Sequence, residues 1–474
     1  MDVVPDHQYH DVVVVGGGIS GLWAAHQLVR GGLANVLVLE AKARVGGRTA
    51  RGSMPAAGGT MVVDLGGQWV GRTQTHILCV MEELGLQTYN QYTAGRNTLQ
   101  LSDGKVRRYS GVIPSCLSVV TLVNLAFLQT RLDALAETVD VACPSNTPSA
   151  AWLDAQTLAS YTYSASITSQ VLELLELTAM CVFGVSAARI SLLYFLAYCK
   201  AAGGFERLLD MGPGGGQELR VQGGAHQMCP MLAGRLGSDR VRLSSPVTAI
   251  AQQGDHVRLT TAGGEVFRAR YVVMAIPPHL CQGVHFAPPL PMLRSHLNSR
   301  LPVGHMLKVV ITYKNAFWRE QGLSGEAISS YGPLALVVDN CSAEGQPALL
   351  AFVCDTTAVV LGARSVEQRK TAVLDALVVL FGDSARFPIG YLEKDWAREE
   401  WNGGCPVGIA GPGWCVLRAF VRVGVWGYMC LAPTPSRTSW MRGHALLTLS
   451  SSHGPACKMA YAIGAVMHSA ISVV

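Results

Sequence analysis

The sequence predicts an α/β protein with more than one domain. Near its start, residues 11–49 read as a buried strand, a glycine-rich turn, a helix and a second strand, the order of a parallel-sheet unit. Residues 166–200 carry apolar positions at helical spacing, and residues 241–278 alternate like strands around a Gly-Gly turn. A chain of 474 residues is also too long for one compact core, so two or three domains are expected.

The composition excludes several classes of protein. Hydrophobic residues make up 49% and charged residues 15%, which argues against disorder and for large buried cores. The net charge is only +5 without a Lys/Arg cluster, so no nucleic-acid partner is expected. The 13 scattered cysteines, and residues 1–15 without a signal-peptide pattern, predict reduced intracellular thiols. No apolar run reaches ~18 residues, and Val119–Leu128 is expected to be a buried helix rather than a membrane span.

The turn after the first strand carries the pattern G-x-G-x-x-G at Gly16, Gly18 and Gly21. In a dinucleotide-binding turn the first glycine permits the tight bend, the second lets backbone N–H groups approach the pyrophosphate, and the third lets helix and strand pack closely. Ser20 lies within this turn and is assigned to the same site. Glu40 ends the second strand, where its carboxylate can accept hydrogen bonds from ribose hydroxyls. The alternative is a glycine turn with a purely structural role.

Two further loops decide between NAD and FAD. "EAKARVGGRT" begins at Glu40, and "DLGGQWVG" spans Asp64–Gly71. A domain that binds NAD does not need these additions, whereas an extended FAD whose flavin must reach a second site does. The predicted FAD-binding residues in these loops are Arg44, Gly47, Arg48, Gly66, Gly67, Gln68 and Trp69.

With these motifs, the sequence resembles the flavin-containing amine oxidase family, and within it the monoamine oxidase branch. The likeness runs from Asp11 to Gly413 and includes "VQGGAHQM" (Val221–Met228) and the string at Phe286–Glu320. It implies a Rossmann-like FAD-binding domain (residues 1–90, 215–295 and 395–413), interleaved with an α+β substrate domain (residues 91–214 and 296–394). In relatives, backbone atoms near the position of Val247 contact the adenine.

The resemblance also implies a reaction, the oxidative deamination of a small-molecule amine. A neutral amine would lose hydrogen from its α-carbon to the flavin, and O2 would then be reduced to H2O2. Lys308 lies in an apolar strand, and its counterpart in the family holds a water against the flavin and is linked to oxygen reactivity. The alternative is a strand-edge lysine that reaches solvent. Neither a metal cluster nor a Ser/His/Asp constellation is expected.

Further residues are carried over to the substrate pocket and the flavin. Gln217 matches a glutamine that lines the amine pocket, and its alternative role is that of a polar turn residue; Cys181 and Leu209 either line the same cavity or belong to the core. Cys405 follows a Gly-Gly pair and matches the cysteine whose sulfur is bonded to the flavin in monoamine oxidases; the alternative is one more buried thiol. Pro406 stands where monoamine oxidases have a tyrosine of their aromatic cage, so their typical substrate preference is not expected to carry over.

The family pattern stops after Gly413. Residues 414–474 lack the Gly-Thr-Glu-Thr turn and the helix that close the FAD site in relatives. This tail is either a diverged C-terminus or a shifted reading frame, because Gly-Thr-Asp-Thr codons read two nucleotides early give strings such as Leu431–Pro435. The chain is therefore either an active amine oxidase or a truncated isoform or pseudoenzyme, with weakened FAD binding and no activity.

The resemblance extends to location and assembly. Monoamine oxidases are anchored in the outer mitochondrial membrane by a C-terminal helix, and the resemblance leaves a homodimer open. Residues 459–474 are apolar but too short and too polar for a clear span, so a cytoplasmic location is the alternative to the membrane.

Overall fold

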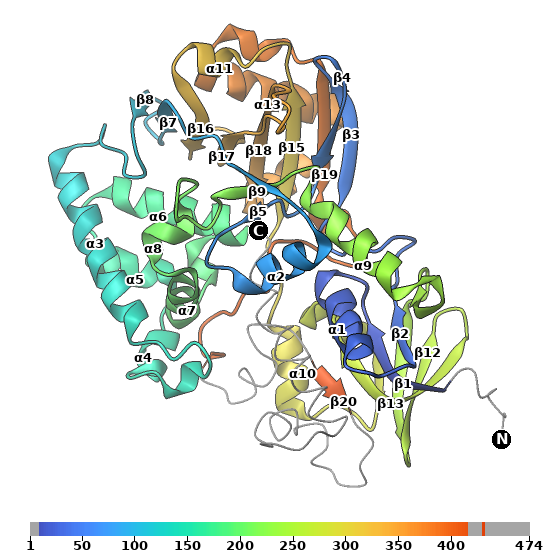
Figure 1. The fold of residues 1–474 in the computed structure, drawn as a ribbon. Coiled ribbons are helices and arrows are strands. Elements are labelled where there is room, and N and C mark those ends of the chain that lie inside the picture. Colours follow the sequence, from blue (N-terminus) through green and yellow to red (C-terminus); the bar gives the residue numbers. More distant parts are fainter. Residues whose placement is uncertain (1–8, 416–428, 432–474) are drawn as a thin grey trace.

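The computed structural model describes residues 9–415 and 429–431, and Figure 1 shows two large sheets with helices packed around them. The first sheet has eight strands in the order β10-β2-β1-β13-β12-β11-β14, with β20 paired antiparallel to β13. Its centre, formed by β2, β1 and β13, is parallel. The strands are β1 (Tyr9–Val15), β2 (Val36–Leu39), β10 (Val241–Arg242), β11 (Val247–Gln253), β12 (His256–Thr261), β13 (Val266–Met274), β14 (His285–Ala287) and β20 (Met429–Leu431).

The two faces of this sheet are covered differently because successive side chains of a strand point to opposite sides. Val12 and Val14 of β1 pack in the same core as helices α1 (Ile19–Arg30), α2 (Thr75–Leu84) and α9 (Met228–Leu236). Val13 and Val15 belong to a separate core with side chains of β11, β12 and β13. The predicted strand–turn–helix–strand unit is therefore present, and it places the glycine-rich turn at the carboxyl end of β1.

The second sheet has seven strands in the order β19-β15-β18-β17-β16-β7-β8. Leu307, Val309 and Ile311 of β15 face a core that includes α11 (Phe317–Glu320), α12 (Asp355–Gly362) and α13 (Val366–Phe381). Met306 and Val310 face the opposite side, toward the middle of the molecule. The strands are β7 (Arg96–Gln100), β8 (Val106–Tyr109), β15 (Met306–Thr312), β16 (Leu323–Ser329), β17 (Leu336–Asp339), β18 (Ala348–Cys354) and β19 (Gly390–Asp395).

A group of helices lies beside the two sheets, on the left of Figure 1. It comprises α3 (Val119–Glu137), α4 (Ala150–Asp154), α5 (Leu158–Ala165), α6 (Ser169–Phe183), α7 (Leu192–Ala202) and α8 (Phe205–Leu209), which share one apolar core. Helix α10 (Met292–Ser299) follows the first sheet.

Helix α3 corrects the expectation that Val119–Leu128 is buried. The segment is helical, but Val119 is 75% exposed, and Val120, Val123 and Phe127 are also exposed. Only one face of the helix, with Leu125 and Leu128, packs against its neighbours. The apolar run continues around the helix, so its other apolar residues lie outside this packed face. Among the described residues, α3 is the one helix with the length and composition of a membrane span, criteria that core helices of soluble proteins also meet.

Two small sheets connect the large ones. One is the hairpin of β3 (Arg51–Ala56) and β4 (Gly59–Asp64); the other contains β5 (Trp69–Val70), β6 (Thr88–Asn90) and β9 (Leu219–Val221). The confirmed fold class is α/β, with a Rossmann-like sheet and a second, mixed domain. The domain boundaries stay a prediction, and most of the predicted tail at 414–474 lies outside the described residues.

Candidate active site

Two adjoining cavities lie between the domains. The first, here the glycine-loop cavity, measures about 410 Å³ and opens at the ends of β1 and β2. The second, here the inner cavity, measures about 210 Å³ and lies between the helices and the second sheet. Arg48 and Pro406 line both, so the two cavities meet at this pair.

The glycine-rich turn fits close backbone packing. Gly16 has φ +113°, and a Cβ there would lie 2.6 Å from the Ala275 carbonyl oxygen. A Cβ on Gly21 would lie 1.9 Å from the Gly16 carbonyl oxygen, so only glycine lets α1 pack this close to the strand. A Cβ on Gly18 would meet only Gly47, at 3.9 Å, and would otherwise occupy the cavity. Gly16 is thus required for the geometry of the backbone, whereas Gly18 leaves space free in the cavity.

The amino end of α1 is open toward the glycine-loop cavity. Its N-cap is Gly18, which has no side chain to accept from the first N–H groups of the helix. Ile19 and Ser20, the first residues of the helix, line the cavity. Uncapped N–H groups and the positive end of the helix dipole form a site for an anion such as a phosphate.

Glu40 is fixed at the floor of the glycine-loop cavity. One of its carboxylate oxygens accepts a hydrogen bond from the Gly17 N–H at 2.6 Å, and the other accepts from the Lys42 N–H at 2.9 Å. The side chain is buried and lines the cavity. Each carboxylate oxygen retains a lone pair, which suits an incoming hydroxyl donor.

Arg48 bridges the two cavities. Its Nη1 donates to the carbonyl oxygen of Pro406 at 2.5 Å. Its guanidinium forms no ion pair with any carboxylate in residues 9–415 and 429–431. A guanidinium carries five N–H donors, so most of them remain for an anionic group bound where the cavities meet.

The other predicted FAD-binding residues divide into three groups. Gly47 and Val247 line the glycine-loop cavity, whereas Gly66, Gly67, Trp69 and Cys405 line the inner cavity. Gly21, Arg44 and Gln68 line neither. Arg44 donates to the Val45 and Thr49 carbonyl oxygens and so braces the loop that contains Gly47.

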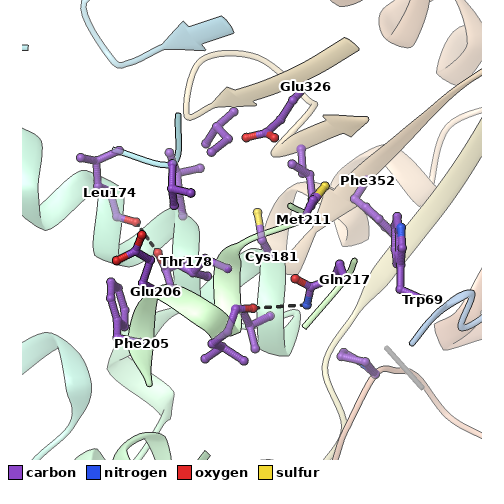
Figure 2. Close-up of a pocket in the computed structure, with 18 of the residues that line it drawn as sticks. Trp69, Leu174, Thr178, Cys181, Phe205, Glu206, Met211, Gln217, Glu326 and Phe352 are labelled. Carbon is purple, nitrogen blue, oxygen red and sulfur yellow. Dashed lines mark hydrogen bonds between the residues drawn. The ribbon is translucent and has the colours of Figure 1, made fainter. Parts of the chain in front are cut away.

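The three predicted pocket residues, Cys181, Leu209 and Gln217, all line the inner cavity, and Figure 2 labels Cys181 and Gln217 among the residues of its wall. Gln217 Nε2 donates to the Leu208 carbonyl oxygen at 3.2 Å. Its Oε1 is buried and has no hydrogen-bond partner among the described residues. A buried amide oxygen left without a donor is costly, so Gln217 Oε1 is available to a bound N–H group.

Lys308 of β15 is 1% exposed, and its ammonium group lies on the face of the sheet that lines the inner cavity. Nζ donates to the Gly66 carbonyl oxygen at 2.7 Å and to Gln68 Oε1 at 2.7 Å. The rings of Trp69 and Phe352 lie 5.7 and 5.8 Å from Nζ. Strand-edge exposure, the alternative considered for this lysine, is therefore wrong.

Burial lowers the pKa of Lys308 to about 7; nearby Asp64 raises the pKa and Arg220 lowers it further. A lowered lysine pKa means that the protonated form costs the folded state free energy. This cost is fully present below about pH 7, decreases as the pH rises, and is absent above the unfolded value of 10.5. Near neutral pH a substantial share of Lys308 is the uncharged amine.

Cys405 is held against the inner cavity by close backbone packing. Gly404 has φ +140°, and a Cβ there would lie 2.4 Å from the Gly304 carbonyl oxygen. The Cys405 N–H donates to the same carbonyl at 3.0 Å. Burial raises the pKa of the Cys405 thiol to about 12, although Arg48 and Lys308 lower it. Cys405 is thus a buried thiol at the junction, beside Pro406.

Apart from Trp69, the aromatic and acidic residues of the inner cavity were not singled out in the sequence. Its aromatic lining comes from Trp69, Tyr109, Phe205, Phe352 and Trp396, and one wall carries Glu326 of β16. Glu326 stands in the strand "LSGEAIS", and a charged residue between buried positions of a strand is the same signal that identified Lys308.

Comparisons with known proteins agree with this arrangement. The model of the flavin-containing amine oxidoreductase family matches residues 19–424. A probable flavin-containing monoamine oxidase A of Dictyostelium discoideum is 33% identical over 405 residues, which is 85% of this chain and 87% of that protein. The flavin-containing amine oxidase B of Bos taurus is 35% identical and covers 91% and 82%. A solved putrescine oxidase bound to putrescine has a TM-score of 0.79 at 30% identity, covering 88% of this chain and 90% of that one.

The family model covers most of the chain, and the relatives match over more than four-fifths of their own length. These findings confirm the family that the sequence motifs predict. The chain belongs to the flavin-containing amine oxidoreductases, a family whose cofactor is FAD and whose monoamine oxidases are similar to this chain.

Proposed function

We propose that this chain binds FAD and oxidatively deaminates a small amine, with O2 as the final electron acceptor and H2O2 as a product. The observation that carries the proposal is the meeting of the two cavities at Arg48 and Pro406, beside the buried Lys308. A dinucleotide in the first cavity would reach the second there, and an amine would reach the same point from the other side.

The residues of the glycine-loop cavity fit FAD. The open amino end of α1, the free space at Gly18 and the guanidinium of Arg48, which forms no ion pair among the described residues, suit a pyrophosphate. The fixed carboxylate of Glu40 suits the ribose hydroxyls. FAD, when bound, supplies the two-electron acceptor that no side chain of the protein provides.

The inner cavity would hold the amine with few polar contacts. Gln217 Oε1 can accept a hydrogen bond from the amine N–H and thereby fix the direction of the α-carbon. Trp69 and Phe352 cover the adjoining wall and exclude water from it. The imine product would be hydrolysed to an aldehyde and ammonia.

Lys308 would support the reaction with oxygen by holding a water molecule. When Lys308 is uncharged, its two N–H bonds are directed at Gly66 and Gln68, which leaves the nitrogen lone pair for a water in the inner cavity. When protonated, it has one further donor for the same water. A pKa of about 7 lets Lys308 exchange that proton near neutral pH.

Cys405 would carry the cofactor covalently through Sγ. Its position at the junction of the cavities and its packing against Gly304 support this role. The raised pKa of the thiol means that attachment would depend on the electrostatic support of Arg48 and Lys308.

The relatives of this chain act on more than one class of amine. Relatives of this chain include monoamine oxidases and a putrescine oxidase. Pro406 cannot supply an aromatic face, so its part of the wall differs from that of a monoamine oxidase. The cellular location and the homodimer stay predictions. The alternative that the chain is a pseudoenzyme also stays a prediction, because the segment on which it depends lies largely outside the described residues.

Replacing Gly18 by Ala should weaken FAD binding without unfolding the protein. The added Cβ enters the cavity, whereas the backbone at Gly18, with φ −77°, accepts any residue. We expect the dissociation constant of FAD to rise at least about 10-fold, as expected when one charge-assisted hydrogen bond is lost. Fluorescence titration of apoprotein that carries Cys405→Ala, in which no covalent link can form, measures this, with Gly234→Ala on α9 as the control. Equal affinity in both variants would place the pyrophosphate elsewhere.

Lys308→Met should slow the reaction with oxygen more than the step that oxidises the amine. The variant keeps an unbranched side chain, one atom shorter than lysine, but removes the amine nitrogen that would hold the water. Stopped-flow reduction under nitrogen and reoxidation by O2 separate the two steps. We expect reoxidation to fall about 100-fold, the scale of a lost general acid–base contribution, while reduction changes little. Amine-dependent H2O2 release at the wild-type rate would remove Lys308 from the mechanism.

The covalent link can be read directly from denatured protein. Acid precipitation of the purified holoprotein should leave the yellow flavin in the pellet, because a thioether survives unfolding. Cys405→Ala should release the flavin into the supernatant, whereas Cys79→Ala, a change at an exposed cysteine, should not. A colourless pellet from the wild type would show a dissociable cofactor, and a protein without flavin would support the pseudoenzyme.

A further inference from the structure

Glu326 is the acidic side chain of the inner cavity whose position the reaction does not explain. It belongs to β16, between the buried Gly325 and Ala327. In Figure 2 its carboxylate points into the space above Cys181 and Met211, on a different wall from Trp69 and Phe352. The side chain is partly buried and lines the inner cavity.

The carboxylate of Glu326 has no partner within the described part of the chain. No N–H or O–H group there donates to it, and no cation forms an ion pair with it. Burial, with a further contribution from Asp210, raises its pKa to about 7. An unpaired carboxylate in such a place is destabilising in its charged form.

The fully buried carboxylates of the described residues are all paired, which makes the partly buried Glu326 an exception. Asp64 accepts from the N–H groups of Ala225 and His226, and Asp339 accepts from Trp318 and from Nε and Nη2 of Arg319. Glu40, Asp154 and Glu218 also accept hydrogen bonds. The partner of Glu326 is therefore expected to come from outside the described chain, through the cavity.

The cationic and acidic side chains of the inner cavity lie on different walls. Its cationic groups, Lys308 and Arg48, lie at the flavin side, where the cavities meet. Acidic groups lie on the other walls: Glu326 inside and Glu206 at an exposed position. Most of the remaining lining is apolar, with Leu, Met and aromatic side chains. An elongated apolar ligand with a cationic far end matches this distribution.

We propose that the inner cavity selects an α,ω-diamine, with Glu326 holding the distal ammonium group while the other amine, uncharged, lies at the flavin side. This inference rests on the proposed amine oxidase function and specifies its substrate class. A monoamine of the same length would leave Glu326 either unpaired or protonated. A diamine would pair it through a charge-assisted hydrogen bond, and the polymethylene chain would fill the apolar part of the cavity.

The test compares two substrates of equal length in two variants. Wild type and Glu326→Gln are assayed with 1,4-diaminobutane and n-pentylamine, then with longer diamine and monoamine pairs to find the preferred length. We expect the wild type to prefer the diamine. In Glu326→Gln the ratio of kcat/KM for diamine over monoamine should fall about 10- to 100-fold, mainly through KM, as for one lost charged hydrogen bond.

Controls separate charge from folding and from simple polarity. Gln has the shape of Glu, and a thermal melt verifies that Glu326→Gln folds; Glu82→Gln removes an equal charge at an exposed site and should leave the ratio unchanged. 4-Aminobutan-1-ol, which has the same length as 1,4-diaminobutane, distinguishes a hydroxyl from an ammonium at the far end. A wild type that prefers n-pentylamine or the amino alcohol, or a ratio unaffected by Glu326→Gln, would overturn the proposal.

Failure of the proposed function has a different signature. If no amine is oxidised, calorimetric binding of 1,4-diaminobutane to the purified protein still decides the role of Glu326. A dissociation constant that rises at least about 10-fold in Glu326→Gln supports the subsite without the enzyme activity. Equal affinity in wild type and variant contradicts it.

Discussion

A buried lysine in the second sheet connects the two parts of the candidate active site. Lys308 has its backbone in the sheet of the substrate side, while its ammonium group is held by Gly66 and Gln68 from the loop that follows β4. Gln68 in turn donates to Asn340, at the end of β17. Because a buried lysine without these acceptors would be strongly destabilising, the loop and the sheet must keep their relative positions, and so must the cavities between them.

The same arrangement sets the electrostatics of the inner cavity. One end has a weakly basic lysine and the guanidinium of Arg48, and another wall has the unpaired Glu326. Both the lysine and the carboxylate have pKa values near 7 because water is largely excluded from them. Near neutral pH, small changes in what occupies the cavity can therefore change both charges.

The sequence allowed the fold class, the glycine turn and the family to be predicted, because these depend on local spacing: Gly16, Gly18 and Gly21 each have a separate geometric reason. Lys308, Gln217, Cys181 and Leu209 were also predicted to belong to one site, and the structure brings them to one cavity. Glu326 and Phe352 were not, since strand alternation indicates which side a residue faces but not which cavity lies there. The exposure of α3 was missed for a similar reason: an apolar run does not reveal how much of it finds a packing partner.

The electrostatics of the inner cavity depend on the protonation state of Lys308, a buried amine on its wall. NMR of protein with isotopically labelled lysine side chains measures its titration directly, and the signal absent from Lys308→Met identifies it. We expect this lysine to titrate near pH 7, apart from the exposed lysines of the chain. A Lys308 that titrates with the exposed lysines, near the ordinary value of 10.5, would contradict it.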